Sequence, residues 1–270
     1  DSMTQHNDKT ALITGASSGI GYELVKLFAK DGYNLILVSR SQEDLEEVAR
    51  KLDTHSSRIT VIAKDLFEPS AAEELYNEVK AKGLKVDILV NDAAQGQYGL
   101  FVEGDLQRYL DIIQLNISSL VVLTHKFLKD MVARGDGKIL NLSSIAGKAP
   151  GPWQAVYHAT KAFVQSFTEG IRSEVKDKGV TITALLPGVT DTDFFNKADM
   201  TASKAVQDKD KMADPADVAK DGYEALMRGD DMVVSGFKNK MQVAMAAITP
   251  DAPLADNMGK QQEPIDKTDK

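Results

Sequence analysis

The chain contains no cysteine, which excludes disulfide bonds and thiolate chemistry. Its four histidines show no spacing typical of metal ligands, so we predict no metal site; they are His6, His55, His125 and His158. Nowhere do about 18 apolar residues run together, so no membrane-spanning helix is expected. The first residues also lack an apolar segment followed by a small-residue cleavage site, and we expect a cytoplasmic protein.

Basic residues are outnumbered, because the chain has 32 Lys and Arg against 40 Asp and Glu. Its net charge is -8 and its pI is about 5.1. Such a chain has no basic footprint for a phosphodiester backbone, so no nucleic-acid partner is expected. By contrast, 43% of the 270 residues are hydrophobic and 27% are charged. These ordinary values predict a globular domain with a substantial core.

Short apolar runs alternate with segments of helical periodicity along most of the chain. Residues 9–14 and 34–39 are two such runs, and "GIGYELVKLFAKDG" lies between them. Nearly continuous apolar strands indicate burial on both faces, as in a parallel sheet covered by helices. The sequence therefore predicts a single-domain, doubly wound α/β fold. Helices are expected at about residues 70–82 and 105–134, and another near Asp214 with Pro215 in its first position.

Four segments define the expected organisation. Residues 1–8 are polar and unpatterned, and we expect them to be disordered or vector-derived, with Met3 as the initiator. The folded domain is expected over residues 9–248, interrupted by a polar loop at about 190–212. Residues 249–270 read as a polar, loosely held tail.

A glycine-rich turn, "TGASSGIG" at residues 14–21, joins the first strand to the first helix. A helix N-terminus at the carboxyl edge of a parallel sheet offers unpaired N–H groups to an anion. Gly15 would turn tightly, Gly19 would allow close backbone approach, and Gly21 would let the helix pack against the strand. The spacing is GxxxGxG and departs from the dinucleotide pattern GxGxxG. The alternative is a flexible turn without a ligand.

The second strand ends with Ser39 and Arg40. A carboxylate at this place binds the ribose of NAD, whereas an arginine accommodates the 2′-phosphate of NADP. NADP(H) is therefore favoured over NAD(H). In the alternative reading Arg40 is merely solvated, before a helix capped by Ser41 and Asp44.

The stretch "VYHATKAF" places Tyr157 four residues before Lys161, so in a helix both side chains reach the same point. Such a pair alone is weak evidence for catalysis. However, "TGASSGIG", "NDAA", "NLSS" and "YHATK" follow one another along one α/β chain. Over about residues 9–236 the sequence thereby resembles the classical short-chain dehydrogenase/reductase family.

This resemblance implies a Rossmann-type fold, a nicotinamide cofactor and a catalytic tetrad of Asn116, Ser144, Tyr157 and Lys161. Ser144 is preferred to Ser143 because the family places its serine 13 residues before the tyrosine. By the same resemblance, Ser144 binds the substrate oxygen, Lys161 holds the nicotinamide ribose, and Asn116 anchors a water. Alternatively, Asn116 is a structural asparagine satisfied in the core.

Hydride transfer to a carbonyl builds negative charge on its oxygen, so a proton donor must stand nearby. Tyr157 is expected to be that donor. Because a free phenol has a pKa near 10, we expect the Lys161 ammonium to lower the pKa of Tyr157. His158 is expected only to pack or to be solvated.

The resemblance also implies further cofactor contacts, in the glycine turn and after later strands. These are Ser17, Ser18, Ile20, Asp65, Leu66, Asn91, Ala93, Pro187, Gly188, Val189, Thr190 and Thr192. Asp65 could equally cap the turn that follows it. The family's usual NNAG is "NDAA" here, so that Asp92 brings an ionisable group and Ala94 a methyl group to the place where the backbone usually approaches the cofactor.

The expected function is NADP(H)-dependent interconversion of a small-molecule carbonyl compound and its alcohol. The alternatives are a 3-oxoacyl-carrier-protein-type ketoreductase and a non-catalytic dinucleotide-sensing protein of the same fold. Pocket-shaping loops are expected to contribute Gln95, Tyr98, Trp153, Phe194 and Phe195, which suggests a largely apolar substrate. A homodimer or homotetramer is expected from the family resemblance alone.

Overall fold

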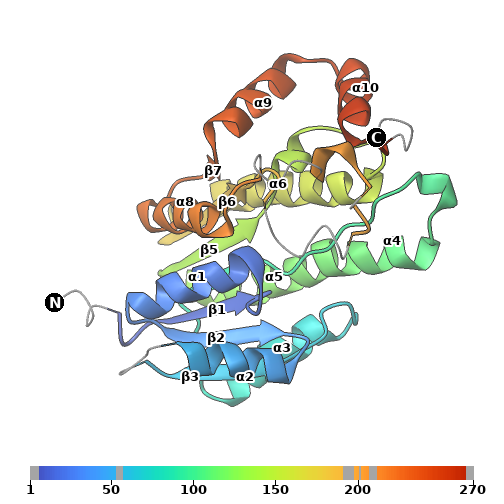
Figure 1. Ribbon diagram of the computed structural model, residues 1–270. Coiled ribbons are helices and arrows are strands. Elements are labelled where there is room, and N and C mark those ends of the chain that lie inside the picture. The colour runs from blue at the N-terminus through green and yellow to red at the C-terminus, as the bar shows by residue number, and fades with distance from the viewer. Residues whose placement is uncertain (1–5, 53–56, 191–197, 201, 207–211, 266–270) are drawn as a thin grey trace.

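The computed structural model describes residues 6–52, 57–190, 198–200, 202–206 and 212–265. One parallel sheet organises them, with seven strands in the order β3-β2-β1-β4-β5-β6-β7 (Figure 1). The strands are β1 (Thr10–Thr14), β2 (Asn34–Ser39), β3 (Ile59–Ala63), β4 (Ile88–Asn91), β5 (Gly137–Leu142), β6 (Val180–Leu186) and β7 (Met232–Val234). The predicted doubly wound α/β fold is confirmed. Its strand order reverses between β1 and β4, where such sheets bind ligands.

Helices cover both faces of the sheet with two separate apolar cores. Helices α1 (Gly19–Lys30), α2 (Gln42–Lys51) and α8 (Pro215–Arg228) pack on one face. Helices α3 (Ala71–Ala81), α5 (Ser119–Arg134) and α6 (Ala155–Val175) pack on the other. The sheet strands are therefore buried from both sides, as their continuous apolar sequences predicted.

The expected long helix at about residues 105–134 begins and ends at recognisable signals. Asp105 caps the N-terminus of α4 (Leu106–Ile113), and Gly135 ends α5 with φ 73°. Between α4 and α5 the chain widens into a π-helical segment, Gln114–Ser118, a distortion that often marks a functional site. The segment contains Asn116.

Residues 249–265 depart from their expected form. Instead of a loosely held tail, α9 (Phe237–Ile248) is followed by α10 (Asp251–Gln262), and both lie at the top of the molecule in Figure 1. Met258 and Gln262 are buried. Ser203 donates hydrogen bonds to the backbone and side-chain carbonyl oxygens of Gln262, and Tyr98 donates to the backbone one. These long-range contacts stabilise a helix that its polar sequence did not predict.

Residues 6–8 are also more ordered than expected. Residues 6–8 form a turn in which His6 stacks on Tyr33 with 4.6 Å between ring centroids. Asn34 donates a hydrogen bond to the Asn7 carbonyl. No helix among the described residues is long and apolar enough to cross a membrane.

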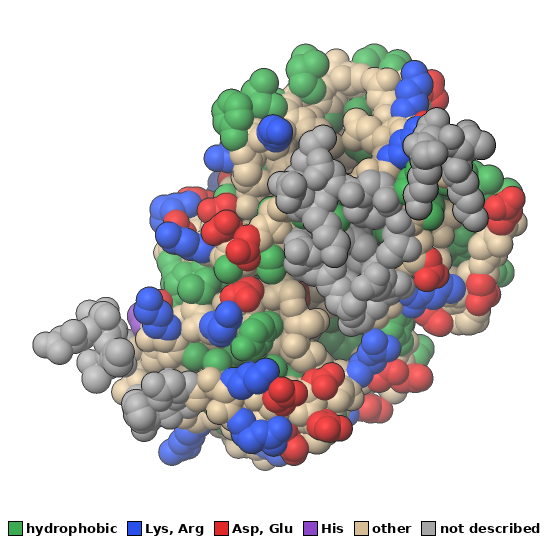
Figure 2. Space-filling view, viewed as in Figure 1, with side chains coloured by type: hydrophobic (Ala, Val, Ile, Leu, Met, Phe, Trp, Pro, Cys, Tyr) green, Lys and Arg blue, Asp and Glu red, His purple; other side chains and the backbone are tan. Residues whose placement is uncertain are grey.

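Helix α9 carries an apolar stripe on its outer side. Met241, Met245 and Ile248 are all exposed, and their spacing places them near one another on the helix surface. Figure 2 shows hydrophobic side chains gathered over α9 at the top of the view. The other side of α9 faces a cavity, to which it contributes Asn239 and Gln242.

Candidate active site

The glycine turn has the geometry that its sequence predicted. Gly15 and Gly19 adopt φ values of 62° and 58°, in the region that favours glycine. A Cβ on Gly21 would lie 2.2 Å from the Gly15 carbonyl oxygen, so only glycine lets α1 pack so closely on the turn. The Ser18 side chain makes no capping hydrogen bond to the first turn of α1, so the N–H groups of that turn other than that of Gly21 are available for an anion.

Asp92 lies directly beneath this turn. Its carboxylate accepts a hydrogen bond from the Gly21 N–H, and its backbone N–H donates to Thr14 Oγ1 at 3.0 Å. Burial raises the pKa of Asp92 to about 7, although the Lys161 ammonium acts in the opposite direction. The sequence identified this residue as a departure from the family pattern but did not assign it a partner.

A cavity of about 770 Å³ opens beside the turn, at the carboxyl edge of the sheet. Ser18, Gly19 and Ile20 line it on one side, and α6 contributes Tyr157 and Lys161. Other predicted residues on its wall are Ser144, Pro187, Gly188, Val189 and Thr190. The cavity therefore brings the glycine turn, the serine and the tyrosine-lysine pair into one site.

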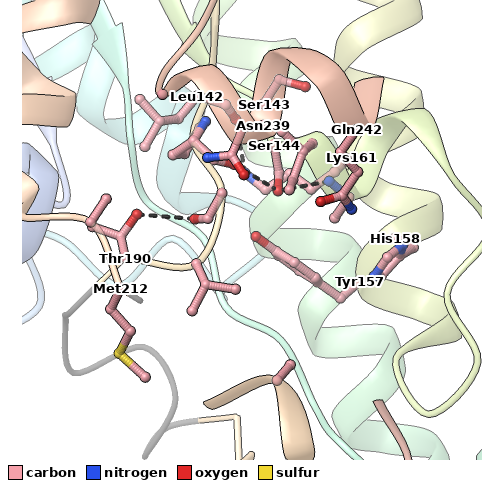
Figure 3. A pocket seen from close by; sticks show the side chains of 18 of the residues that line it. Leu142, Ser143, Ser144, Tyr157, His158, Lys161, Thr190, Met212, Asn239 and Gln242 are labelled. Atoms are coloured by element: carbon pink, nitrogen blue, oxygen red, sulfur yellow. Dashed lines mark hydrogen bonds between the residues drawn. The ribbon is translucent and has the colours of Figure 1, made fainter. Parts of the chain in front are cut away.

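Within this cavity Tyr157 and Ser144 meet. The Tyr157 ring extends into the cavity toward Ser144, whereas His158 points the other way (Figure 3), and the two hydroxyl groups are hydrogen-bonded. Ser144 also accepts from the Ala146 N–H at 3.0 Å, which fixes its side chain at the start of a short 3₁₀ turn. His158 is buried and contacts the Ala149 carbonyl through Nδ1 at 2.8 Å, so it packs, as expected.

Lys161 is buried on the same helix face as Tyr157. Its Nζ donates to the Leu142 carbonyl at 2.8 Å and lies 5.9 Å from the centroid of the Tyr157 ring. Burial lowers the pKa of Lys161 to about 8, opposed by the Asp92 carboxylate.

One electrostatic expectation is wrong. The pKa of Tyr157 is not lowered but raised to about 12, chiefly by burial, with the Ser144 hydrogen bond lowering it and Asp92 raising it further. The physical reason is that the Lys161 ammonium donates its hydrogen bond to a backbone carbonyl, and the negative charge of Asp92 offsets part of its positive charge. Desolvation of the phenolate then outweighs the attraction of the lysine.

Asn116 is held in the π-helical segment by three hydrogen bonds. Its side-chain amide donates to the Gln95 carbonyl at 2.8 Å and to Thr160 Oγ1 at 3.0 Å, and its Oδ1 accepts from the Gln95 N–H at 3.0 Å. Asn116 thus joins the loop after β4 to α6, one residue from Lys161. These contacts satisfy the asparagine within the protein, as the structural alternative proposed.

The residues expected near the adenosine end lie at the carboxyl ends of β2 and β3. Arg40 is exposed, and its guanidinium lies over the Phe67 ring, 5.4 Å from the centroid. Asp65 accepts a hydrogen bond from the Phe67 N–H at 3.0 Å, so it caps the turn, and Leu66 is buried in the core. Ser41 caps α2 by accepting from the Asp44 N–H.

Two of the predicted cofactor contacts, Asn91 and Ala93, make hydrogen bonds to other residues of the protein. Asn91 donates to Thr124 Oγ1 at 3.1 Å and to Asn141 Oδ1 at 2.9 Å, so its side chain ties β4 to α5 and β5. The Ala93 N–H donates to Thr14 Oγ1 at 3.1 Å. Ser17 belongs to the glycine turn, and Thr192 lies outside the described residues.

The expected pocket-shaping aromatics mainly pack against one another. Tyr98 stacks on Trp153, with 5.8 Å between ring centroids, and Tyr98 also binds α10. Gln95 accepts from Arg108 at 2.7 Å. None of Gln95, Tyr98 and Trp153 is on the cavity wall, while Phe194 and Phe195 lie outside the described residues.

Sequence reasoning missed the contribution of the C-terminal helices to the cavity. Phe237, Asn239 and Gln242 from α9 and Met258, Gln261 and Gln262 from α10 line it. No local signal in the sequence places either helix over the site. Arg108, from α4, was also missed; its guanidinium lies 5.8 Å from the centroid of Phe67, the ring that Arg40 contacts.

The residues present fit a dinucleotide. The open glycine turn forms part of the cavity wall, and the Oγ atoms of Ser39 and Ser143 have no hydrogen-bond partner among the described residues. Ser39 ends β2, where a dinucleotide fold binds ribose. Ser143 is on the cavity wall next to Ser144.

Comparison with known proteins establishes the family. The family model for short chain dehydrogenase matches residues 9–203, and the chain belongs to that family. It is an oxidoreductase that acts on CH–OH and C=O groups with a nicotinamide dinucleotide.

Three similar proteins illustrate the relationship. An uncharacterized oxidoreductase from Staphylococcus saprophyticus is 31% identical over 84% of this chain and 94% of its own. Very-long-chain 3-oxoacyl-CoA reductase-A from Danio rerio is 35% identical, over 74% of this chain and 62% of its own. The solved structure of a short-chain dehydrogenase from Sphingobium yanoikuyae in complex with NADPH has 26% identity and a TM-score of 0.78, covering 92% of this chain and 99% of that one.

Proposed function

We propose that this enzyme uses NADP(H) to interconvert a largely apolar carbonyl compound and its alcohol, with Tyr157 as the general acid and base. The observation that carries the proposal is the hydrogen-bonded Tyr157–Ser144 pair on the wall of the cavity, with Lys161 buried beside it. When bound, the nicotinamide supplies or accepts the hydride. The chain itself must orient the carbonyl and manage the proton.

In the reductive direction Tyr157 starts with its proton, because its pKa of about 12 keeps the phenol neutral at physiological pH. The hydroxyl groups of Ser144 and Tyr157 lie within hydrogen-bonding distance of each other, so a carbonyl oxygen bound beside them can accept a hydrogen bond from each. As negative charge builds on that oxygen, the Tyr157 Oη proton moves to it. Lys161 stabilises the remaining phenolate, and the Asn116–Thr160 contact keeps α6 in register with the loop after β4.

A spectrophotometric panel tests the proposed reaction. Purified protein should oxidise NADPH, seen as falling nicotinamide absorbance, in the presence of medium-sized ketones or aldehydes. Binding of the cofactor without turnover of any carbonyl compound would instead support the dinucleotide-sensing alternative.

The NADP(H) preference rests on Arg40 at the end of β2. An exposed guanidinium held over Phe67 suits a 2′-phosphate, and the Sphingobium yanoikuyae relative was solved with NADPH. We expect Arg40→Asp to weaken NADPH binding about 100-fold while changing NADH binding little, because a like charge opposite a phosphate costs several kcal/mol.

Fluorescence titration of both cofactors measures this preference. Arg50→Asp makes the same charge change at the exposed C-terminal end of α2 and should leave both affinities near their wild-type values. Equal losses for NADPH and NADH in Arg40→Asp would show that Arg40 does not read the 2′-phosphate.

The apolar substrate class rests on the cavity wall away from the glycine turn. Met200, Met212, Met258 and Phe237 provide apolar surface there, and flexible methionine side chains adapt to large, varied ligands. A 3-oxoacyl thioester is a second candidate, favoured by the Danio rerio relative. Parallel assays with a 3-oxoacyl thioester and with simple bulky ketones separate the two by kcat/KM.

A homodimer or homotetramer is part of the same proposal. Leu106, Leu110 and Ile113 on α4 and Phe163 on α6 are exposed, and the two helices lie against each other. A second copy would cover this apolar face. We expect Leu110→Glu to lower the native mass toward that of a monomer, measured by light scattering after gel filtration; an unchanged mass would contradict this interface.

A further inference from the structure

Asp92 connects the glycine turn to the tyrosine-lysine pair. A Cβ built on Gly15 would lie 2.7 Å from Asp92 Oδ2, and one on Gly21 would lie 2.4 Å from the same atom, so this oxygen sits directly against the turn. Asp92 is also on the wall of the cavity, together with Ser18 and Gly19. A bound anion and the Asp92 carboxylate would therefore both lie against the same turn.

We propose that Asp92 is a positioning residue that couples cofactor binding to the uptake of one proton, so that its neutral form supports the turn for the dinucleotide and its ionised form opposes binding. This role is particular to this chain, because asparagine, the family's usual residue at this position, does not ionise.

The charges around Asp92 set the direction of the effect. Lys161 on α6 favours the carboxylate, and the Gly21 N–H of α1 donates to it. Tyr157, also on α6, is neutral at the relevant pH because its pKa is about 12. The residues of the turn, Gly15 to Gly21, carry no ionisable side chain, and Thr14 of β1 accepts a hydrogen bond from the backbone N–H of Asp92. Lys161 is thus the one charged group acting on Asp92 among the described residues.

The sign follows from the two protonation states. The pKa of Asp92 is raised to about 7 by burial, so below about pH 7 the free enzyme holds a neutral acid there. An anion bound at the turn disfavours the carboxylate and raises this pKa further. Binding is then tightest below about pH 7 and weakens above it, by up to about tenfold for each pH unit while one proton is taken up. The pKa of Lys161 is about 8, so the loss of its positive charge weakens binding only at higher pH.

Fluorescence titration of NADPH between about pH 6 and 8 tests the coupling with wild type and Asp92→Asn. Asparagine keeps an oxygen for the Gly21 N–H without the charge. We expect the wild-type Kd to rise about tenfold more than the variant Kd across this range. Comparison at each pH cancels the titration of the cofactor's own 2′-phosphate. Parallel pH profiles for the two proteins would overturn the proposal.

Isothermal titration calorimetry of the wild type supplies a second readout that does not depend on any variant folding. NADH, which has no 2′-phosphate, is titrated at about pH 7.5 in buffers of different ionisation enthalpy. Proton uptake on binding is expected, and its absence would overturn the proposal.

The matched control for the fluorescence titration is Asp87→Asn. Asp87 is a buried side chain before β4 that accepts from the Thr10 N–H, and the variant should keep the wild-type NADPH pH profile. Both measurements follow binding alone, so a failure of the proposed carbonyl chemistry would not affect them.

Discussion

Replacing Tyr157 with phenylalanine should lower kcat/KM for carbonyl reduction by about 10²- to 10⁴-fold, the usual contribution of a positioned general acid. The phenol is the group that meets Ser144 in the cavity, and phenylalanine preserves the ring while removing the transferable proton. The loss should fall mainly on kcat, because the ring still fills its place. Steady-state assays at saturating NADPH measure it.

The control for this variant is the same substitution of tyrosine by phenylalanine at a position outside the cavity. Tyr22 lies on α1 and is not among the residues of the cavity wall, so Tyr22→Phe should retain wild-type activity. The NADPH Kd of Tyr157→Phe should stay within a few-fold of wild type. If Tyr157→Phe reduced carbonyl compounds at the wild-type rate, the assignment of the acid would be wrong.

Lys161→Met is expected to have a comparable effect but with a different kinetic signature. The ammonium is buried, donates to the Leu142 carbonyl and lies beside the Tyr157 ring. Its loss removes the positive charge that stabilises the phenolate, so kcat should fall by about 10²- to 10³-fold. NADPH affinity should fall as well, because the family resemblance makes Lys161 the residue that holds the nicotinamide ribose. Steady-state kinetics give the first quantity and fluorescence titration the second.

The wild-type pH profile provides an independent check on Lys161. Because burial lowers the pKa of Lys161 to about 8, its ammonium is lost as pH rises through that value, and kcat should decline above about pH 8. Lys176→Met, at the exposed C-terminal end of α6, makes the same charge change and should keep both the rate and the alkaline decline. A flat wild-type profile to about pH 10 would contradict the role given to the lysine.

Local patterns predicted the elements that dominate the sheet. Continuous apolar runs predicted the buried parallel strands. Pro215 after Asp214 predicted the start of α8, and Asp214 caps this helix by accepting from the Ala216 N–H. Such signals depend on neighbouring residues alone and survive without tertiary context. The ends of the chain were harder: α10 forms because Tyr98 and Ser203, far away in sequence, bind Gln262.

For the site, the order of motifs was enough to indicate which residues meet. The glycine turn, Ser144 and the Tyr157–Lys161 pair do line one cavity, because parallel strands bring their carboxyl ends to one edge of the sheet. The motifs did not show that α9 and α10 close this cavity, nor that Tyr98 and Trp153 pack on each other instead of lining it.

The sequence by itself determined the family, the α/β architecture and the set of side chains available for proton transfer. Only the tertiary structure decided the electrostatics among them. A pKa depends on desolvation and on charges a few ångströms away, and neither is encoded in the spacing of a motif. Asp92 appeared in the sequence as a single departure from a pattern; in the folded chain it lies between the glycine turn and Lys161, where its charge can govern cofactor binding.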